Sequence, residues 1–235
     1  MPESVSIPRR FNGPLESGQG GYCSGVVAGF LEEAAEVSLR RPVPLDTPLD
    51  VARESEGSVH LLHGETLIAE ARSVSEVELE VPAPVSPRVA HLAAKHYRGL
   101  SKGPFSRCFV CGRAREDAFG VFAGAVDRGP LVASPWTPPS WTGDAEGHVL
   151  PEFVWAVLDC PTYFALYASG ALLQSVLARL TARIDAPVVA GAEHVVTAWP
   201  IAADGRKRQA GSAVLSPDGE VLAVARALLI EPRVG

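Results

Sequence analysis

One aspartate in this chain stands inside an apolar stretch, where a carboxylate is costly to bury. Asp159 lies near the end of the segment Phe153–Cys160, whose other residues are all apolar. Removing a polar group from water without a hydrogen-bond partner costs about 2–7 kcal/mol, so such a residue usually has a task. Asp159 is therefore a candidate catalytic residue. The alternative is structural, with the side chain at a helix end bonding backbone groups around Pro161-Thr162.

A pair of glycines could supply backbone N–H groups that bind a negatively charged group. Gly20 and Gly21 come directly before an apolar helical pattern. Successive free amides at the amino end of a helix bind anions or an oxyanion, although the same pair could instead serve a tight turn and close helix packing. Asn12, in the turn-rich stretch before them, could orient water or substrate, or could form the turn itself. His148, just before a second apolar helix, could donate to a substrate carbonyl or face water.

Two cysteines have the spacing of half a zinc site, Cys108-Phe109-Val110-Cys111. A structural zinc site needs four ligands, and the sequence has no second CxxC. We therefore favour a turn with two half-buried thiols over a metal site or a redox pair, and we expect neither a metal nor another cofactor. Further ligands would have to come from distant positions, namely Cys23, Cys160, His96 or His148.

In the first half of the chain, the spacing of apolar residues predicts a helix over about 20–33, followed by strands. Among these strands, 59–62 and 66–71 are joined by the turn His63-Gly64-Glu65 and are predicted to form a hairpin. The proline-rich stretch after these strands is predicted to contain one short helix around 90–95.

The second half is predicted to repeat this order. An apolar helix is expected over about 150–160, with an interruption at Pro161. A further helical segment is predicted over about 171–182, because its leucines and valines fall on one helical face. Strands are then predicted at 194–199, 210–215 and 221–230.

The shared order of elements indicates a tandem repeat of one small α+β unit. A short sequence match between Thr66–Arg72 and Glu220–Arg226 supports it. Two such units side by side would form one antiparallel sheet wrapped around both helices. We expect an N-terminal unit at 1–95, a linker with the CxxC turn at 96–118, and a C-terminal unit at 119–235.

Composition narrows the function classes. The 235 residues are 47% hydrophobic and 20% charged, which is typical of a globular chain, and the four cysteines indicate reduced thiols. The net charge of −6 comes from interspersed acids and bases, so neither a nucleic-acid surface nor a membrane patch is indicated. No apolar run approaches the length of a membrane span, and no secretory signal is visible. We expect a cytoplasmic protein with no nucleic-acid or membrane partner.

Several segments carry a resemblance to a known family: Phe11–Pro14, Gly20–Tyr22, Val43–Leu49, Cys108–Gly112 and Pro151–Pro161. With these motifs the chain resembles the double-hotdog acyl-CoA thioesterase-like proteins. The resemblance implies a tandem hotdog fold of the α+β class. It is less specific for activity, because hotdog domains also serve dehydration and acyl binding.

The resemblance also implies a site. In hotdog thioesterases a carboxylate on the central helix acts as general base or nucleophile at the thioester carbonyl, and backbone N–H groups polarise that carbonyl. Asp159 occupies the matching place in the second helix, whereas the first helix has Gly29 or Phe30 near that place, so one active site is expected. A glutamine that relatives often carry near the last strand is absent here, where Arg226 could stand in.

The resulting hypothesis is an acyl-CoA thioesterase-like hydrolase that binds acyl-CoA or another acyl thioester and could form a homodimer. Asp159 is the expected catalytic residue, with Gly20, Gly21, Asn12 and His148 as substrate or oxyanion ligands. Two alternatives stay open. One is a non-hydrolytic acyl-CoA or small-acyl binding protein, and the other is a hotdog enzyme of different chemistry, such as a dehydratase or a tailoring enzyme.

Overall fold

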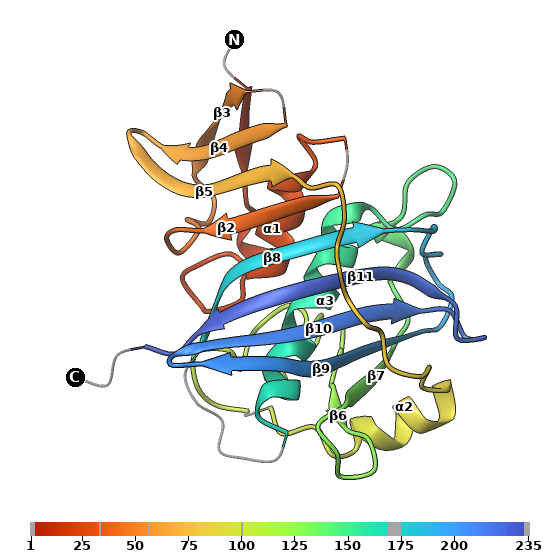
Figure 1. The fold of residues 1–235 in the computed structure, drawn as a ribbon. Coiled ribbons are helices and arrows are strands. Elements are labelled where there is room, and N and C mark those ends of the chain that lie inside the picture. The colour runs from red at the N-terminus through yellow and green to blue at the C-terminus, as the bar shows by residue number, and fades with distance from the viewer. Residues whose placement is uncertain (1–2, 33, 56, 100, 169–174, 233–235) are drawn as a thin grey trace.

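The structure is a computed structural model that describes residues 3–32, 34–55, 57–99, 101–168 and 175–232 (Figure 1). Strands dominate it. The first half holds β1 (Glu3–Ser6), β2 (Ala35–Leu39), β3 (Pro48–Ser55), β4 (Ser58–His63) and β5 (Thr66–Ser73). The second half holds β6 (Gly124–Ala125), β7 (Val132–Trp136), β8 (Val176–Ile184), β9 (His194–Asp204), β10 (Lys207–Leu215) and β11 (Val221–Ile230).

These strands form one 11-stranded sheet in the order β1-β3-β4-β5-β2-β8-β11-β10-β9-β7-β6. Every neighbouring pair is antiparallel. β2 pairs with β8 at the middle, with Val37 opposite Leu180, so the sheet continues from one half of the chain into the other. The predicted hairpin is confirmed as β4 and β5.

The two halves repeat one another about the central pair. Outward from β2 the order is β5, β4, β3, β1, and outward from β8 it is β11, β10, β9, β7. The matched segment Thr66–Arg72 lies on β5, and its counterpart Glu220–Arg226 begins one residue before β11 and continues along it, so the two segments hold equivalent places. The predicted tandem α+β architecture is confirmed.

Two helices fill the concave face of the sheet. α1 (Gly20–Ala28) precedes β2 and α3 (Pro151–Leu166) precedes β8, and both lie behind the sheet in Figure 1. α1 ends at Ala28 with Gly29 as its C-cap, earlier than predicted. No helix among the described residues has the length and apolar character to cross a bilayer.

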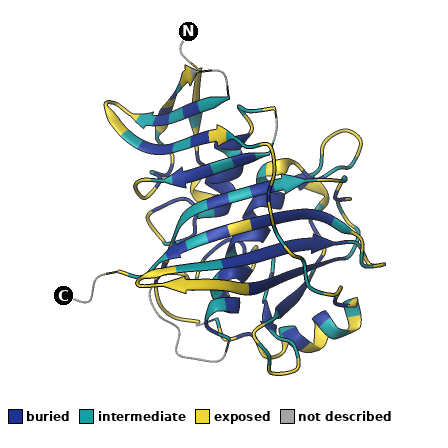
Figure 2. Ribbon diagram, viewed as in Figure 1, coloured by how far each residue is buried: buried dark blue, intermediate teal, exposed yellow. Residues whose placement is uncertain are grey.

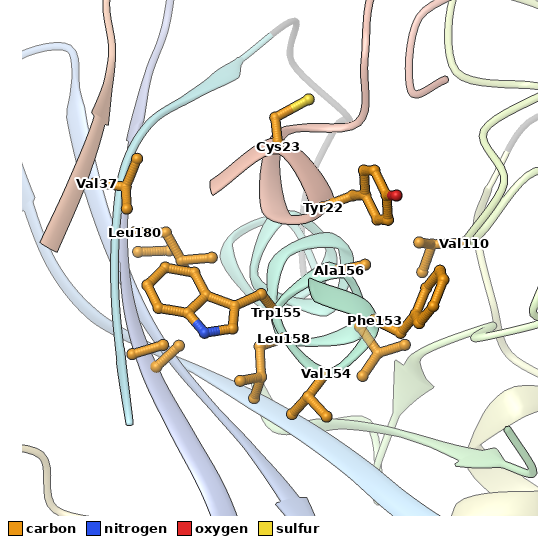
Figure 3. Packing of buried hydrophobic residues seen from close by; sticks show 14 of the residues in the cluster. Tyr22, Cys23, Val37, Val110, Phe153, Val154, Trp155, Ala156, Leu158 and Leu180 are labelled. Atoms are coloured by element: carbon orange, nitrogen blue, oxygen red, sulfur yellow. The ribbon is translucent and has the colours of Figure 1, made fainter. Parts of the chain in front are cut away.

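The helices run antiparallel and pack closely, because α1 presents glycine to α3. A Cβ added at Gly25 would lie 2.5 Å from Glu152 Cα and 2.9 Å from Trp155 Cβ. Trp155 itself points to Val37 and Leu180, the residues that pair at the centre of the sheet (Figure 3). One core thus spans both halves of the chain.

The opposite face of the sheet is covered only in part (Figure 2). Residues 74–97 cross it in front of the second half's strands and include α2 (Pro87–Ala94), the predicted short helix. Ala90 and Ala93 of α2 belong to a second buried cluster on this face, together with Trp199 of β9. The first half leaves this face polar, with Arg72 bonded to Glu36 at 2.9 Å across β5 and β2.

The helix predicted over 171–182 is wrong where the structure describes it. Residues 176–184 form β8, Ser175 before it is not helical, and positions 171–174 of the predicted helix lie outside the described residues. The apolar residues Ala178, Leu180 and Ala182 alternate with Arg179 and Thr181, which is the period of a strand. This segment forms a strand because it pairs with β2 on one side and with β11 on the other.

The interruption predicted at Pro161 is also wrong, since α3 continues through it to Leu166. Proline removes one helical N–H and crowds the carbonyl of the preceding turn. Two side chains donate to the carbonyls that follow the crowded one: the Ser212 hydroxyl donates to the Leu158 oxygen at 2.7 Å, and the Thr162 hydroxyl donates to the Asp159 backbone oxygen at 2.6 Å.

Candidate active site

Asp159 projects from α3 toward the amino end of α1. Its Oδ2 accepts hydrogen bonds from Gln19 Nε2 at 2.6 Å and from the Gly21 N–H at 2.9 Å. The residue is only 9% exposed, and its second oxygen, Oδ1, accepts no hydrogen bond from the described residues. The carboxylate does not bond backbone around Pro161 and Thr162, the structural alternative considered above. One oxygen is anchored, and the other has no hydrogen-bond donor in the described part of the chain.

Gln19 anchors the acid through its position as the N-cap of α1. Its Oε1 accepts a hydrogen bond from the Tyr22 N–H at 2.6 Å, which leaves Nε2 facing α3. There Nε2 donates to Asp159 and, at 3.3 Å, to the Ala156 backbone oxygen. Turning the amide over would lose the cap and the anchor together. Gln19 was not among the predicted site residues; the signal that could have found it is a polar residue directly before a helix start.

Burial changes the acid–base character of Asp159. Desolvation raises the pKa of its carboxyl from 3.8 to about 7, because a low-dielectric surrounding penalises the charged form. The Gly21 N–H opposes this rise, and Cys108 nearby adds to it. A carboxyl of this kind can take up and release a proton near neutral pH, as general-base chemistry requires.

The glycine pair divides into two roles. The Gly21 N–H is committed to Asp159, and a Cβ there would lie 2.6 Å from Asp159 Cβ and 3.0 Å from Ala156 Cα. The Gly20 N–H, one residue earlier, has no hydrogen-bond partner among the described residues. Gly20 and Asp159 both line one cavity. Gly21 thus positions the acid, and Gly20 holds the amide that remains available for an oxyanion.

This cavity has a volume of about 430 Å³, which is within the range of small-molecule sites. Gln19, Gly20 and Asp159 give it a polar wall. Strands from both halves line the rest with apolar side chains, among them Leu39 and Leu177. Two exposed cationic residues, Arg40 and Arg41, lie where it meets solvent.

Asn12 and His148 are not brought to this cavity. The buried Asn12 amide is engaged in loop contacts, donating to the Arg107 backbone oxygen at 3.2 Å and accepting from Arg115 Nη1 at 2.8 Å. His148 lies in the turn before α3, where its backbone N–H donates to Asp144 Oδ1 at 2.8 Å. Neither residue lines the cavity, and their predicted roles in substrate binding stay predictions.

Arg226, considered as a polar stand-in, lies on the outer face of β11. It donates to Gln209 Oε1 on β10 at 2.7 Å from Nη2, and it does not line the cavity. The four tryptophans are likewise absent from the cavity lining; Trp136, Trp155 and Trp199 are buried in the two cores.

The two helices are unequal at the catalytic position. Asp159 is the ninth residue of α3, and the ninth residue of α1 is Ala28, one residue before the predicted equivalent. Ala28 cannot ionise, so the pseudo-symmetric position carries no acid. The described residues hold this carboxylate arrangement once.

A third thiol joins the two of the CxxC turn. Cys160, next to Asp159 on α3, lies beside Cys108 and Cys111, and all three line the cavity. Cys23, His96 and His148, the other ligands considered, are not part of this group.

Comparison with known structures supports the architecture. The tesB protein of Mycobacterium avium subsp. paratuberculosis matches with a TM-score of 0.63 at 16% identity, covering 98% of this chain and 92% of that one. A protein of unknown function with a hot dog fold from Alicyclobacillus acidocaldarius matches with a TM-score of 0.62 at 11% identity, covering 99% and 93%. The fold is a double hotdog.

A candidate thioesterase II from Thermobifida fusca aligns equally well with this double hotdog, with a TM-score of 0.62 at 12% identity and coverage of 98% and 92%. No protein-family model and no curated protein matches the sequence. Identities this low carry the fold alone, so the activity has to be argued from the site.

Proposed function

We propose that this double-hotdog protein hydrolyses acyl thioesters, with acyl-CoA as the substrate class and Asp159 as general base or nucleophile. One observation carries the proposal. A buried carboxylate, anchored through one oxygen at the amino end of a helix, lines an apolar cavity, and its second oxygen accepts no hydrogen bond from the described residues. An acyl chain fits the apolar walls, and its thioester carbonyl would lie between Asp159 and the Gly20 amide.

In the water route, Asp159 Oδ1 takes a proton from a water molecule whose oxygen adds to the thioester carbon. The resulting oxyanion accepts a hydrogen bond from the Gly20 N–H. The C–S bond then breaks, the thiolate leaves and takes the proton from Asp159, and the products are a carboxylic acid and a free thiol. General-base assistance of this type contributes about 10²–10⁴-fold, and loss of one oxyanion donor costs about 10²–10³-fold in other enzymes.

In the nucleophile route, Asp159 Oδ1 itself adds to the carbon, and loss of the thiolate leaves a mixed anhydride on Asp159. Water then hydrolyses the anhydride and frees the acid. A single turnover in ¹⁸O-water that leaves ¹⁸O in Asp159 would identify the nucleophile route, because the label enters the protein when water attacks the Asp159 carbonyl of the anhydride.

The deciding experiment is a panel of acyl-CoA substrates of different chain length, with thiol release followed spectroscopically. We expect turnover by the native protein and a loss of ~10²-fold or more in Asp159→Asn, because the amide keeps the volume but cannot accept the proton. Glu152→Gln is the matched control, an acid on the same helix outside the cavity lining, and should retain activity.

Two results would go against the proposal. Full activity in Asp159→Asn would remove the residue from the reaction. Tight binding of an acyl-CoA by the native protein, with no thiol released from any member of the panel, would favour the non-hydrolytic acyl-binding alternative.

A further inference from the structure

Three thiols from separate segments of the chain meet on one side of the cavity. Cys108 and Cys111 come from the turn between the two halves, and Cys160 comes from α3. Their sulfur atoms all lie within 4.8 Å of one another, and the Cys108 and Cys160 sulfurs are 3.8 Å apart. All four cysteines of the chain are free, and the fourth, Cys23, is not in this group.

The turn holds its two sulfurs together by backbone bonds. The Gly112 N–H donates to the Cys108 oxygen at 2.8 Å, and a Cβ at Gly112 would lie 2.5 Å from the Cys108 nitrogen. The Tyr97 hydroxyl fixes the far end of the turn by donating to the Cys111 oxygen at 2.6 Å.

The third sulfur is held from the opposite side. Gln19 Nε2 lies 3.5 Å from the Cys160 sulfur while it donates to Asp159. Tetrahedral zinc binds thiolates at about 2.3 Å, which places any two of its sulfur ligands about 3.8 Å apart. The separation of Cys108 and Cys160 equals this value, so small side-chain movements would close the group around one ion.

We propose that Cys108, Cys111 and Cys160 bind one Zn²⁺. All three line the cavity, so the fourth coordination position would face it and take water or another light-atom ligand. Binding exchanges the three thiol protons for the metal, and the protons pass to solvent. A disulfide would use two of the thiols and would need an oxidant. The site would tie the CxxC turn to α3, and it stands independently of thioester hydrolysis.

Metal content of the full chain tests the proposal. The protein is purified under reducing conditions, incubated with Zn²⁺, dialysed and analysed by mass spectrometry for bound metal. We expect about one zinc per chain in the native protein and in Cys23→Ala, the matched control. Cys160→Ala should lose most of the metal, because two thiolates from one turn hold zinc weakly.

A second measurement avoids dependence on a variant that fails to fold. Co²⁺ added to the native protein should produce the thiolate-to-cobalt charge-transfer band and the intense visible bands of tetrahedral coordination, and Zn²⁺ should abolish both. X-ray absorption of the zinc form should give three sulfur ligands and one light atom. Native protein that retains no zinc, Cys160→Ala that retains as much as native, or a four-sulfur shell would overturn the proposal.

Discussion

Replacement of Gly21 by alanine tests the close contact on which the site depends. The added methyl would meet Asp159 Cβ at 2.6 Å, Ala156 Cα at 3.0 Å and, closer still, the Trp155 carbonyl oxygen. All three neighbours belong to α3, so the methyl can be accommodated only by moving one helix away from the other. Overpacking of a core costs about 1–3 kcal/mol, and the helix preference of alanine over glycine returns up to about 1 kcal/mol. We expect Gly21→Ala to lower the free energy of unfolding by about 2 kcal/mol, or the Tm by roughly 4–8 °C.

Gly20→Ala is the neighbouring control, with the opposite expectation. Its methyl would meet mainly the flexible end of Leu177, at 2.9 Å, and Asp159 Oδ2 at 3.2 Å. Leu177 can rotate away, so stability should change by less than about 1 kcal/mol, whereas thioester turnover should fall because the methyl stands beside the acid and the free amide. Urea unfolding of both variants gives the comparison. If Gly21→Ala is as stable as the native protein, or Gly20→Ala is the less stable of the two, the described helix contact is incorrect.

Two further predictions concern charge. Arg41 is exposed where the cavity meets solvent, where it could contact the phosphates of CoA. Arg41→Ala should therefore raise KM for acyl-CoA roughly three- to tenfold at low salt and leave KM unchanged for an acyl-N-acetylcysteamine, which lacks phosphates. Equal effects on both substrates would contradict a phosphate contact. Burial lowers the pKa of His194 below 6.5, so the unfolded chain binds that proton more tightly than the folded chain. The resulting stability is present above pH 6.5 and is lost as pH falls from there toward the folded-state pKa. His194→Gln should therefore show a smaller loss of unfolding free energy than the native protein between about pH 7.5 and 5.5, and an unchanged slope would count against the assignment.

The fold was predictable where local signals agree with tertiary pairing. The turn at His63-Gly64-Glu65 connects two β-rich segments, and β4 and β5 pair about it. The sequence-based prediction failed at 176–184, where the spacing of leucine and valine fits a helix and a strand alike. Only the neighbours of β8 in the sheet decide between them, and these are far away in sequence.

The acid of the candidate site, Asp159, was predictable from the sequence, whereas the residues that hold it in place were not. Asp159 is conspicuous because an apolar segment surrounds it, whereas Gln19 is an ordinary polar residue until α3 packs against α1. The third thiol is a similar case, since Cys160 reaches Cys108 only through the tertiary fold. Contacts between residues so distant in sequence leave no local pattern.

Fusion of two hotdog units in one chain explains why the described residues hold this carboxylate arrangement once. In two identical units, each helix would offer both an acid and free amides to the other. Here α3 begins with Pro151, at the place that Gly20 holds in α1, and proline has no N–H to donate. The amino end of α3 thus lacks the donor, and Ala28 lacks the acid, so the second position has neither of the groups that the first carries. Each helix has kept one role: α1 supplies backbone amides and close approach, and α3 supplies the carboxylate.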